Sequence, residues 1–250
     1  MAIYQFVAEL KNFKPRMWRR FVVTDDMKLS HFAYAVMYMF GCQASHLFAL
    51  SAKKESSEDD SCAQAPQNII DIRNLLNNKI NEKDKRELLQ DIFKKSASSF
   101  VGNEITYQIP SEDIVNESED IRNYKVLDVF KKAKDNVRLE YDFGDGWEFK
   151  ISLEKILEDD TFEKEDLPFV LKGKVRGIIE DCGGPWFLQD LVERFQKSKD
   201  PNYCGDDLSE DEEDWYGEDL EEILYFDVDE VNGGLLEGIE DQECSFESDF

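Results

Sequence analysis

The sequence predicts an α+β protein in which an antiparallel sheet packs against helices. Apolar and polar side chains alternate along residues 4–10 and again along residues 137–153, which is the period of half-buried strands. Residues 31–40 and 186–195 instead carry an apolar stripe on one side, as amphipathic helices do. The chain has 250 residues and is 41% hydrophobic, so it is large enough to bury a core between such elements.

The first two strands are expected to form a hairpin. Residues 4–10 alternate, and residues 12–15 (Asn-Phe-Lys-Pro) interrupt the pattern. Residues 17–24 are rich in valine and aromatic side chains and predict the second strand.

A helix and a short strand should follow the hairpin. The helix is expected at residues 31–40, with Ser30 as its N-cap and Gly41 as its stop signal. Residues 46–50 resemble a short strand.

The composition divides the chain into three expected parts. Residues 1–51 and 101–199 form the core domain, which contains the strand and helix patterns. Residues 52–100 begin with a polar loop and continue with helical patterns, so we expect an insertion there. Residues 200–250 contain 21 acidic residues and no Lys or Arg, and form an acidic C-terminal segment.

The net charge restricts the partners of the chain. It contains 56 acidic residues against 30 Lys and Arg, which leaves −26 at pH 7. Such a charge repels nucleic-acid phosphates and anionic membranes, and favours cations or basic proteins. We therefore expect a protein partner with a basic surface, no membrane association, and no direct nucleic-acid binding by the acidic segment.

The five cysteines favour a cytoplasmic location. They are widely spaced and odd in number, and none forms a Cys-x-x-Cys pair, so reduced thiols are expected. The sequence also shows no signal-peptide pattern and no apolar run long enough for a membrane span.

The second alternating stretch predicts another hairpin. A three-residue Gly-Asp-Gly loop would pair Phe143 with Trp147 and keep one face of both strands apolar. In that register Asp142 and Glu148 face each other on the polar side, with Asp145 at the tip.

The C-terminal part should contain two helices. Residues 181–185 (Asp-Cys-Gly-Gly-Pro) form a turn that leads into the helix at residues 186–195. A last short helix is expected at residues 227–236, ending near Gly238.

Four short stretches carry a resemblance to a known family. They are residues 15–20 (PRMWRR), Phe40-Gly41 with His46-Leu47-Phe48, residues 141–148 (YDFGDGWE) and residues 180–185 (EDCGGP). In order and rough spacing they are similar to the plasmid pRiA4b ORF-3-like family, whose members are passenger or TnpR-type proteins of mobile elements. The resemblance implies a compact α+β fold, and it brings no established activity.

The chain departs from the family pattern at two places. Phe149 stands where the family tends to have His, and residues 174–179 replace a Cys-rich segment. Both differences weaken the case for a metal or nucleophile site that is shared with the family.

The acidic hairpin is a candidate cation site. Asp142, Asp145 and Glu148 would offer hard oxygen ligands to Mg²⁺ or Ca²⁺, with His46 as a further ligand. The alternative is a structural turn in which nearby arginine or lysine side chains neutralise the acids.

A compact basic patch surrounds Trp18 in the expected second strand. Arg19 and Arg20 beside Trp18 could bind phosphates or stack on bases. The alternative, which the overall charge favours, is that these arginines neutralise acids within the chain.

Cys182 follows Asp181 at the expected start of a helix, where a thiol pKa can be lowered. No motif places a second histidine as its base, and a sharp entry into the helix explains the following Gly-Gly-Pro. A structural role is therefore favoured over a nucleophile.

These candidates support three hypotheses of function. The first is a non-enzymatic binding module without catalytic residues, which engages a protein or small ligand. The second is a divalent-cation-dependent enzyme that uses the acidic hairpin, and no other cofactor is expected. In the third, acidic residues 206–222 mimic nucleic acid and occupy a DNA-binding partner. The candidate binding residues are Trp18, Arg19, Arg20, His46, Tyr141, Asp142, Asp145, Trp147, Glu148, Asp181 and Cys182.

Overall fold

The structure, a computed structural model, describes residues 2–54, 104–110, 118–157, 162–199, 209, 211, 216 and 220–249. By its internal contacts the chain divides into two units, Met1–Ala52 with Thr106–Phe250, and Lys53–Ile105. Beyond its first three residues, the insertion expected at residues 52–100 lies outside the described residues. Most of the acidic run at residues 206–222 also lies outside them.

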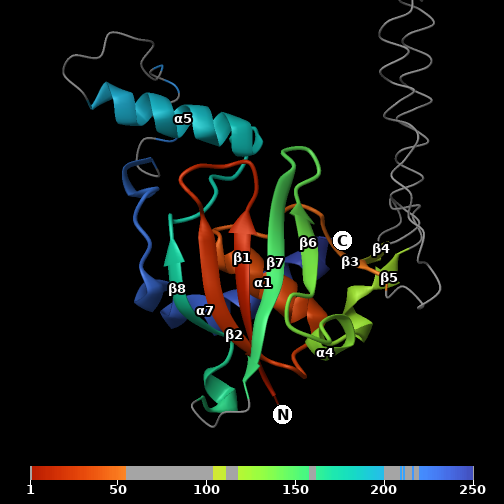
Figure 1. The fold of residues 1–250 in the computed structure, drawn as a ribbon. Coiled ribbons are helices and arrows are strands. Elements are labelled where there is room, and N and C mark those ends of the chain that lie inside the picture. The colour runs from red at the N-terminus through yellow and green to blue at the C-terminus, as the bar shows by residue number, and fades with distance from the viewer. Residues whose placement is uncertain are drawn as a thin grey trace, which may run out of the picture. The chain divides into compact units, whose positions relative to one another are not determined.

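An eight-stranded, mostly antiparallel sheet organises the described residues (Figure 1). The strand order is β5-β4-β3-β6-β7-β1-β2-β8. The strands are β1 (Ile3–Leu10), β2 (Trp18–Thr24), β3 (Phe48–Lys53), β4 (Glu104–Gln108), β5 (Glu119–Asp120), β6 (Asn136–Tyr141), β7 (Trp147–Leu157) and β8 (Phe169–Lys174). Strands β4 and β5 pair in parallel, whereas β1–β2, β1–β7, β2–β8, β3–β6 and β6–β7 pair antiparallel. The sheet and its helices confirm the predicted α+β class.

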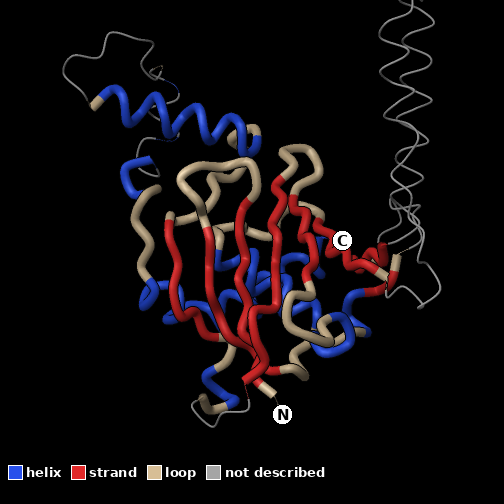
Figure 2. The backbone as a smooth tube through the Cα atoms, in the orientation of Figure 1, coloured by secondary structure: helices blue, strands red, loops and turns tan. Residues whose placement is uncertain are grey.

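The longer helices lie in two places relative to the sheet. Behind it, as drawn in Figure 1, α1 (Leu29–Met39) packs with α7 (Val228–Asp249). By contrast, α5 (Gly184–Ser198) lies at the end where the loops β1–β2 and β6–β7 emerge (Figure 2). The short elements are η1 (Ile121–Asn123), α4 (Val126–Val129) and η2 (Lys164–Asp166). Each described helix is too short or too polar to cross a bilayer.

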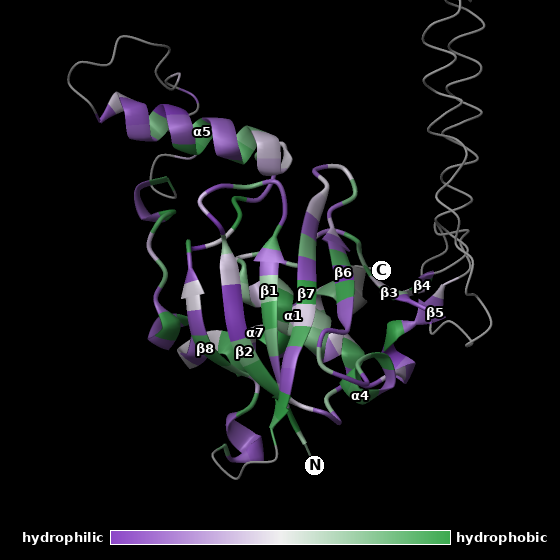
Figure 3. Cartoon of the chain, in the orientation of Figure 1, coloured by the Kyte–Doolittle hydropathy of each residue, from purple (hydrophilic) through white to green (hydrophobic). Residues whose placement is uncertain are grey.

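The main core lies between α1 and the sheet. Phe6, Phe21, Phe32 and Phe130 are fully buried, and neighbouring ring centroids lie between 4.7 and 5.9 Å apart. Burial of each ring contributes about 2 kcal/mol to folding. Figure 3 shows much of α1 in the hydrophobic colours, and its buried residues include Phe32, Val36 and Met39 of the predicted apolar stripe.

The start of α1 differs from the prediction. The helix begins at Leu29, and Lys28 occupies the N-cap without a side-chain hydrogen bond. Ser30 is buried inside the first turn, so its hydroxyl is not the cap. The sequence favoured Ser30 because serine is a common N-cap, but the apolar stripe starts one residue earlier.

The predicted end of the last helix is wrong. Helix α7 continues to Asp249 instead of ending near Gly238. A Cβ atom at Gly234 or Gly238 would overlap the side chain of Tyr38 in α1. The glycines therefore allow the two helices to approach closely, and they do not stop α7.

The β6–β7 hairpin differs from the predicted register by two residues. Tyr141 pairs with Trp147, so the loop spans residues 142–146, and Phe143 is 53% exposed within it. Side chains two positions apart on a strand point to the same side, so both registers keep one face apolar. The alternation alone could not distinguish them.

Candidate functional site

Three segments that are far apart in the sequence meet near the start of α5. The β6–β7 loop contacts the loop after α1, because the N–H of Asp142 donates to the carbonyl of Leu47 at 3.0 Å. The same β6–β7 loop contacts the turn before α5, because the N–H of Gly183 donates to the carboxylate of Asp145 at 3.0 Å. These contacts bring together His46, Asp142 and Asp181, which come from the three segments.

Glycine is required where the turn meets the hairpin. Gly184 has a φ of +87°, and a Cβ atom there would overlap the carbonyl oxygen of Asp145. Pro185 follows in the first turn of α5. The Gly-Gly-Pro sequence therefore does more than start the helix, since it also permits this close approach.

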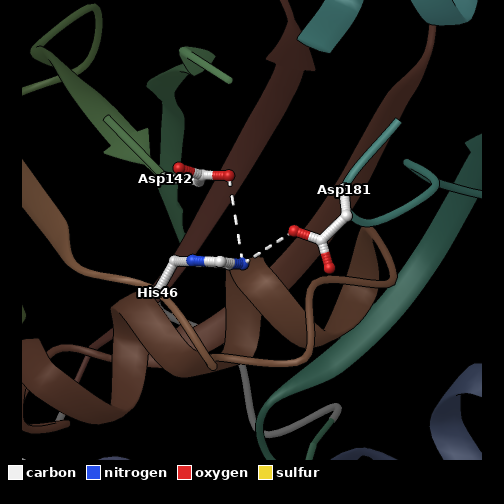
Figure 4. Close-up of side chains that lie close together, drawn as sticks. All are labelled: His46, Asp142 and Asp181. Atoms are coloured by element: carbon white, nitrogen blue, oxygen red, sulfur yellow. Dashed lines mark ion pairs between the residues drawn. The ribbon is translucent and has the colours of Figure 1, made fainter. Parts of the chain in front are cut away.

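His46, Asp142 and Asp181 place three potential ligand atoms side by side (Figure 4). His46 Nε2 lies 3.3 Å from Asp181 Oδ1 and 4.0 Å from Asp142 Oδ2. All three ligand atoms lie within 4.8 Å of one another. The His46 side chain is 34% exposed and that of Asp181 is 78% exposed, so solvent ions reach the group directly.

Glu180 adds a fourth side chain from the protein interior. Its side chain is only 10% exposed. Oε1 accepts hydrogen bonds from Gln43 N–H at 2.7 Å and from the Tyr141 hydroxyl at 2.8 Å. Oε2 is buried, has no hydrogen-bond partner among the described residues, and lies 3.9 Å from His46 Nε2. Burial raises the pKa of Glu180 above its ordinary value.

The backbone of the hairpin loop aims Asp142 at this group. Asp142 has a φ of +49°, and its Oδ1 accepts the N–H groups of Gly144 at 2.9 Å and Asp145 at 3.3 Å. This local turn occupies Oδ1, so Oδ2 is the atom that faces His46.

The other two expected metal ligands lie elsewhere. Asp145 uses its carboxylate to accept the Gly183 N–H, and Glu148 faces Glu140 across the hairpin instead of Asp142. The two-residue change in register explains the position of Glu148. We name the set of His46, Asp142, Glu180 and Asp181 the HDED cluster.

Arg19 is a core residue and not part of a surface patch. Its guanidinium is buried and donates to the carbonyls of Met39 at 2.9 Å and Lys174 at 3.0 Å, and to those of Trp18 and Arg176. It also lies over the ring of Phe40, at 4.6 Å from its centroid, and over that of Phe226, at 3.7 Å. Burial lowers its pKa to about 9.

Trp18 and Arg20 remain nearer the surface, and their neighbours are within the sheet. Arg20 Nε lies 2.7 Å from Glu154 Oε2, and its guanidinium lies 5.6 Å from the Trp18 ring. The guanidinium of Arg16 lies 5.5 Å from the Trp18 ring, and Arg16 pairs with Glu9 at 2.8 Å. Among the described residues, Arg16 and Arg20 therefore pair with acids of β1 and β7, and not with Asp142, Asp145 or Glu148.

The Cys182 thiol is buried and contacts the carbonyl of Gly184 at 3.9 Å. Burial raises the pKa of Cys182 to about 12, which keeps the thiol protonated at neutral pH. Trp147, the first residue of β7, is fully buried. Burial therefore removes both residues from the set of candidate binding residues that solvent can reach.

The family model described as "Plasmid pRiA4b ORF-3-like protein" matches residues 2–233. The chain belongs to the plasmid pRiA4b ORF-3-like family. This match confirms the resemblance seen in the four stretches, three of which contribute residues to the HDED cluster. None of the curated proteins compared matches the chain.

A solved structure shares the fold of this pRiA4b ORF-3-like chain. It is the crystal structure of a protein of unknown function, MM3350 from Methanosarcina mazei Go1, with a TM-score of 0.56. The two chains are 22% identical, and the match covers 92% of this chain and 97% of the other. At that identity the likeness shows the fold alone.

Glu180 is the functional candidate that sequence reasoning missed. It stands beside Asp181 in the family stretch Glu180–Pro185, so a signal was present. Two adjacent acids look alike in the sequence, however, and only the structure shows that one is buried and the other exposed.

Proposed function

We propose that this pRiA4b ORF-3-like protein binds a divalent metal ion through the HDED cluster. The observation that carries the proposal is the buried oxygen Oε2 of Glu180, which has no hydrogen-bond partner in the described part of the chain and faces the ring of His46. A buried carboxylate oxygen is costly without a partner, and a metal ion would supply one.

The charges of the cluster support a cation. Asp142, Glu180 and Asp181 surround a single imidazole, and no ion pair between described residues joins any of the three to a Lys or Arg. Like charges at such distances are unfavourable unless a positive charge lies between them. A divalent ion carries two positive charges, so it would offset this repulsion more fully than the single charge of a protonated His46.

The distances also suit an ion. A tetrahedral ion with bonds of about 2.1 Å holds its ligand atoms about 3.4 Å apart. His46 Nε2 lies 3.3 Å from Asp181, 3.9 Å from Glu180 and 4.0 Å from Asp142, so small side-chain movements would complete the coordination.

The donor set selects the class of metal. Oxygen ligands alone suit Mg²⁺ or Ca²⁺, the ions expected from the acidic hairpin in the sequence. An imidazole among the ligands favours first-row transition ions instead. We therefore propose Mn²⁺ or Zn²⁺ as the ion. The proposed role is that of a metal-binding protein and requires no catalytic step.

Calorimetric titration of the full chain with Mn²⁺ and Zn²⁺ tests the proposal. We expect saturable binding that His46→Gln weakens by about 100-fold or more, beyond the roughly 10–100-fold effect of residues outside the coordination shell. His31→Gln is the matched control, because His31 pairs with Glu243 between α1 and α7 at 3.0 Å. Circular dichroism checks that both variants fold. Absence of binding by the unmodified chain, or equal binding by His46→Gln, would refute the proposal.

A further inference from the structure

We infer that helix α7 positions Glu180 for metal binding through Gln242. The inference rests on the proposed function, because it concerns a ligand of the same cluster. Gln242 is 7% exposed and lies in the C-terminal part of α7, beyond residue 233, where the family match ends.

One peptide group connects Gln242 to Glu180. Gln242 Nε2 donates to the carbonyl of Cys42 at 2.6 Å, and the N–H of Gln43 donates to Glu180 Oε1 at 2.7 Å. The carbonyl of Cys42 and the N–H of Gln43 belong to the same peptide bond, which is planar. The orientation that Gln242 imposes on the carbonyl is therefore passed to the N–H that holds Glu180.

The position of Glu180 depends on this N–H. Gln43 and Tyr141 both donate to Oε1, which leaves Oε2 to face His46. Hydrogen bonds in such a chain also polarise one another, so the donor on α7 strengthens the bond to the carboxylate. Loss of the Gln242 amide would free the peptide to rotate and would release Oε1.

Helix α7 is held firmly enough for this role. Gly234 and Gly238 lie against Tyr38 of α1. The Oε1 atom of Gln242 has no hydrogen-bond partner among the described residues, so the buried amide acts there as a donor to Cys42. Because coupling between two equilibria is reciprocal, metal binding at Glu180 should also stabilise the docked α7.

Gln242→Leu tests the inference in the full chain. We expect about tenfold weaker binding of Mn²⁺ or Zn²⁺ by calorimetry, as for other residues that orient a metal ligand. Glu243→Gln is the matched control on α7, because it removes a contact with α1 and leaves the link to Cys42 intact. Added metal should slow hydrogen exchange of the α7 amides in the unmodified chain and have a smaller effect in Gln242→Leu.

A double-mutant cycle separates positioning from a general loss of stability. In a Glu180→Gln background, titrated at higher ion concentration, Gln242→Leu should have little further effect on metal affinity. An equal loss in both backgrounds, or unchanged affinity in Gln242→Leu, overturns the inference and leaves the proposed metal site standing. If the unmodified chain binds neither ion, the proposed function fails and the inference fails with it.

Discussion

The hydroxyl of Tyr141 donates to Glu180 Oε1 at 2.8 Å and joins the end of β6 to the turn before α5. Tyr141 is fully buried, and it shares this oxygen with the N–H of Gln43. Two donors on one carboxylate oxygen leave the other oxygen directed at His46. The fold therefore sets the orientation of Glu180 independently of a bound ion.

Tyr141→Phe should weaken both the fold and the metal site. Loss of one buried hydrogen bond to a carboxylate lowers the free energy of unfolding by about 1–3 kcal/mol, measured by urea denaturation. Affinity for Mn²⁺ should fall in the same variant, because Glu180 loses one of its two anchors. Tyr225→Phe is the control, because its hydroxyl bonds Asp227 at 3.1 Å on the exposed surface. Wild-type values for Tyr141→Phe in both measurements would contradict the role assigned to this hydrogen bond.

Glu180→Gln should stabilise the metal-free protein at neutral pH. Burial raises the folded-state pKa of Glu180 above its ordinary value of 4.5, so the folded state binds the proton more tightly than the unfolded chain. The free energy of unfolding therefore falls as pH rises through the window between the two pKa values, and the loss is complete above it. The glutamine side chain in Glu180→Gln does not ionise, so the free energy of unfolding of this variant does not fall in this way as pH rises.

Urea denaturation in the presence of a chelator, from pH 4.5 to pH 8, measures this effect. The advantage of Glu180→Gln over the unmodified chain should be largest at neutral pH and shrink as pH falls toward 4.5, the ordinary pKa of a glutamate. An advantage that grows with acidity would show that the sign is wrong.

Arg19→Met should be far more destabilising than Arg20→Met. The first change leaves the buried carbonyls of Met39 and Lys174 without their donor, which costs about 3 kcal/mol or more. The second removes a partly exposed ion pair with Glu154, which is worth about 1 kcal/mol or less. Thermal melting of the two variants under the same conditions compares them, and equal losses would contradict the structural role of Arg19.

Gly184→Ala should disturb the site more than Gly146→Ala. Both glycines have positive φ, which costs an alanine about 1–2 kcal/mol. A Cβ atom at Gly146 meets nothing within 4 Å, whereas one at Gly184 overlaps the carbonyl of Asp145. Only Gly184→Ala should therefore push the turn that carries Asp181 away from the hairpin and reduce metal affinity. Titration of both variants with Zn²⁺ measures the difference, and similar affinities would contradict the importance of this contact.

Local sequence patterns predicted the main strands and helices, because the spacing of apolar residues shows which side of an element is buried. The alternation of residues 4–10 and the apolar stripe of residues 31–40 correspond to β1 and α1. The hairpin register escaped prediction because a shift of two residues leaves the alternation unchanged. The end of α7 was predicted wrongly because glycine in a sequence can mark either the end of a helix or a close contact between two packed helices.

Only part of the candidate site could be read from the sequence. His46 and Asp142 were expected to act together, and they do lie together. The sequence could not distinguish Glu180 from its exposed neighbour Asp181. The two carboxylates differ only because the fold removes water from one of them, which raises the energetic cost of its charge.

By itself the sequence determined the class of fold, the family and the strongly acidic charge, because these follow from local periodicity, short stretches and composition. Tertiary structure decided which acids share one imidazole, which arginine is buried, and which glutamine on α7 reaches the loop after α1. Those relationships join segments up to 200 residues apart, as in the hydrogen bond from Gln242 to Cys42. Such contacts depend on how the helices and loops pack around the sheet, and no local pattern encodes that packing.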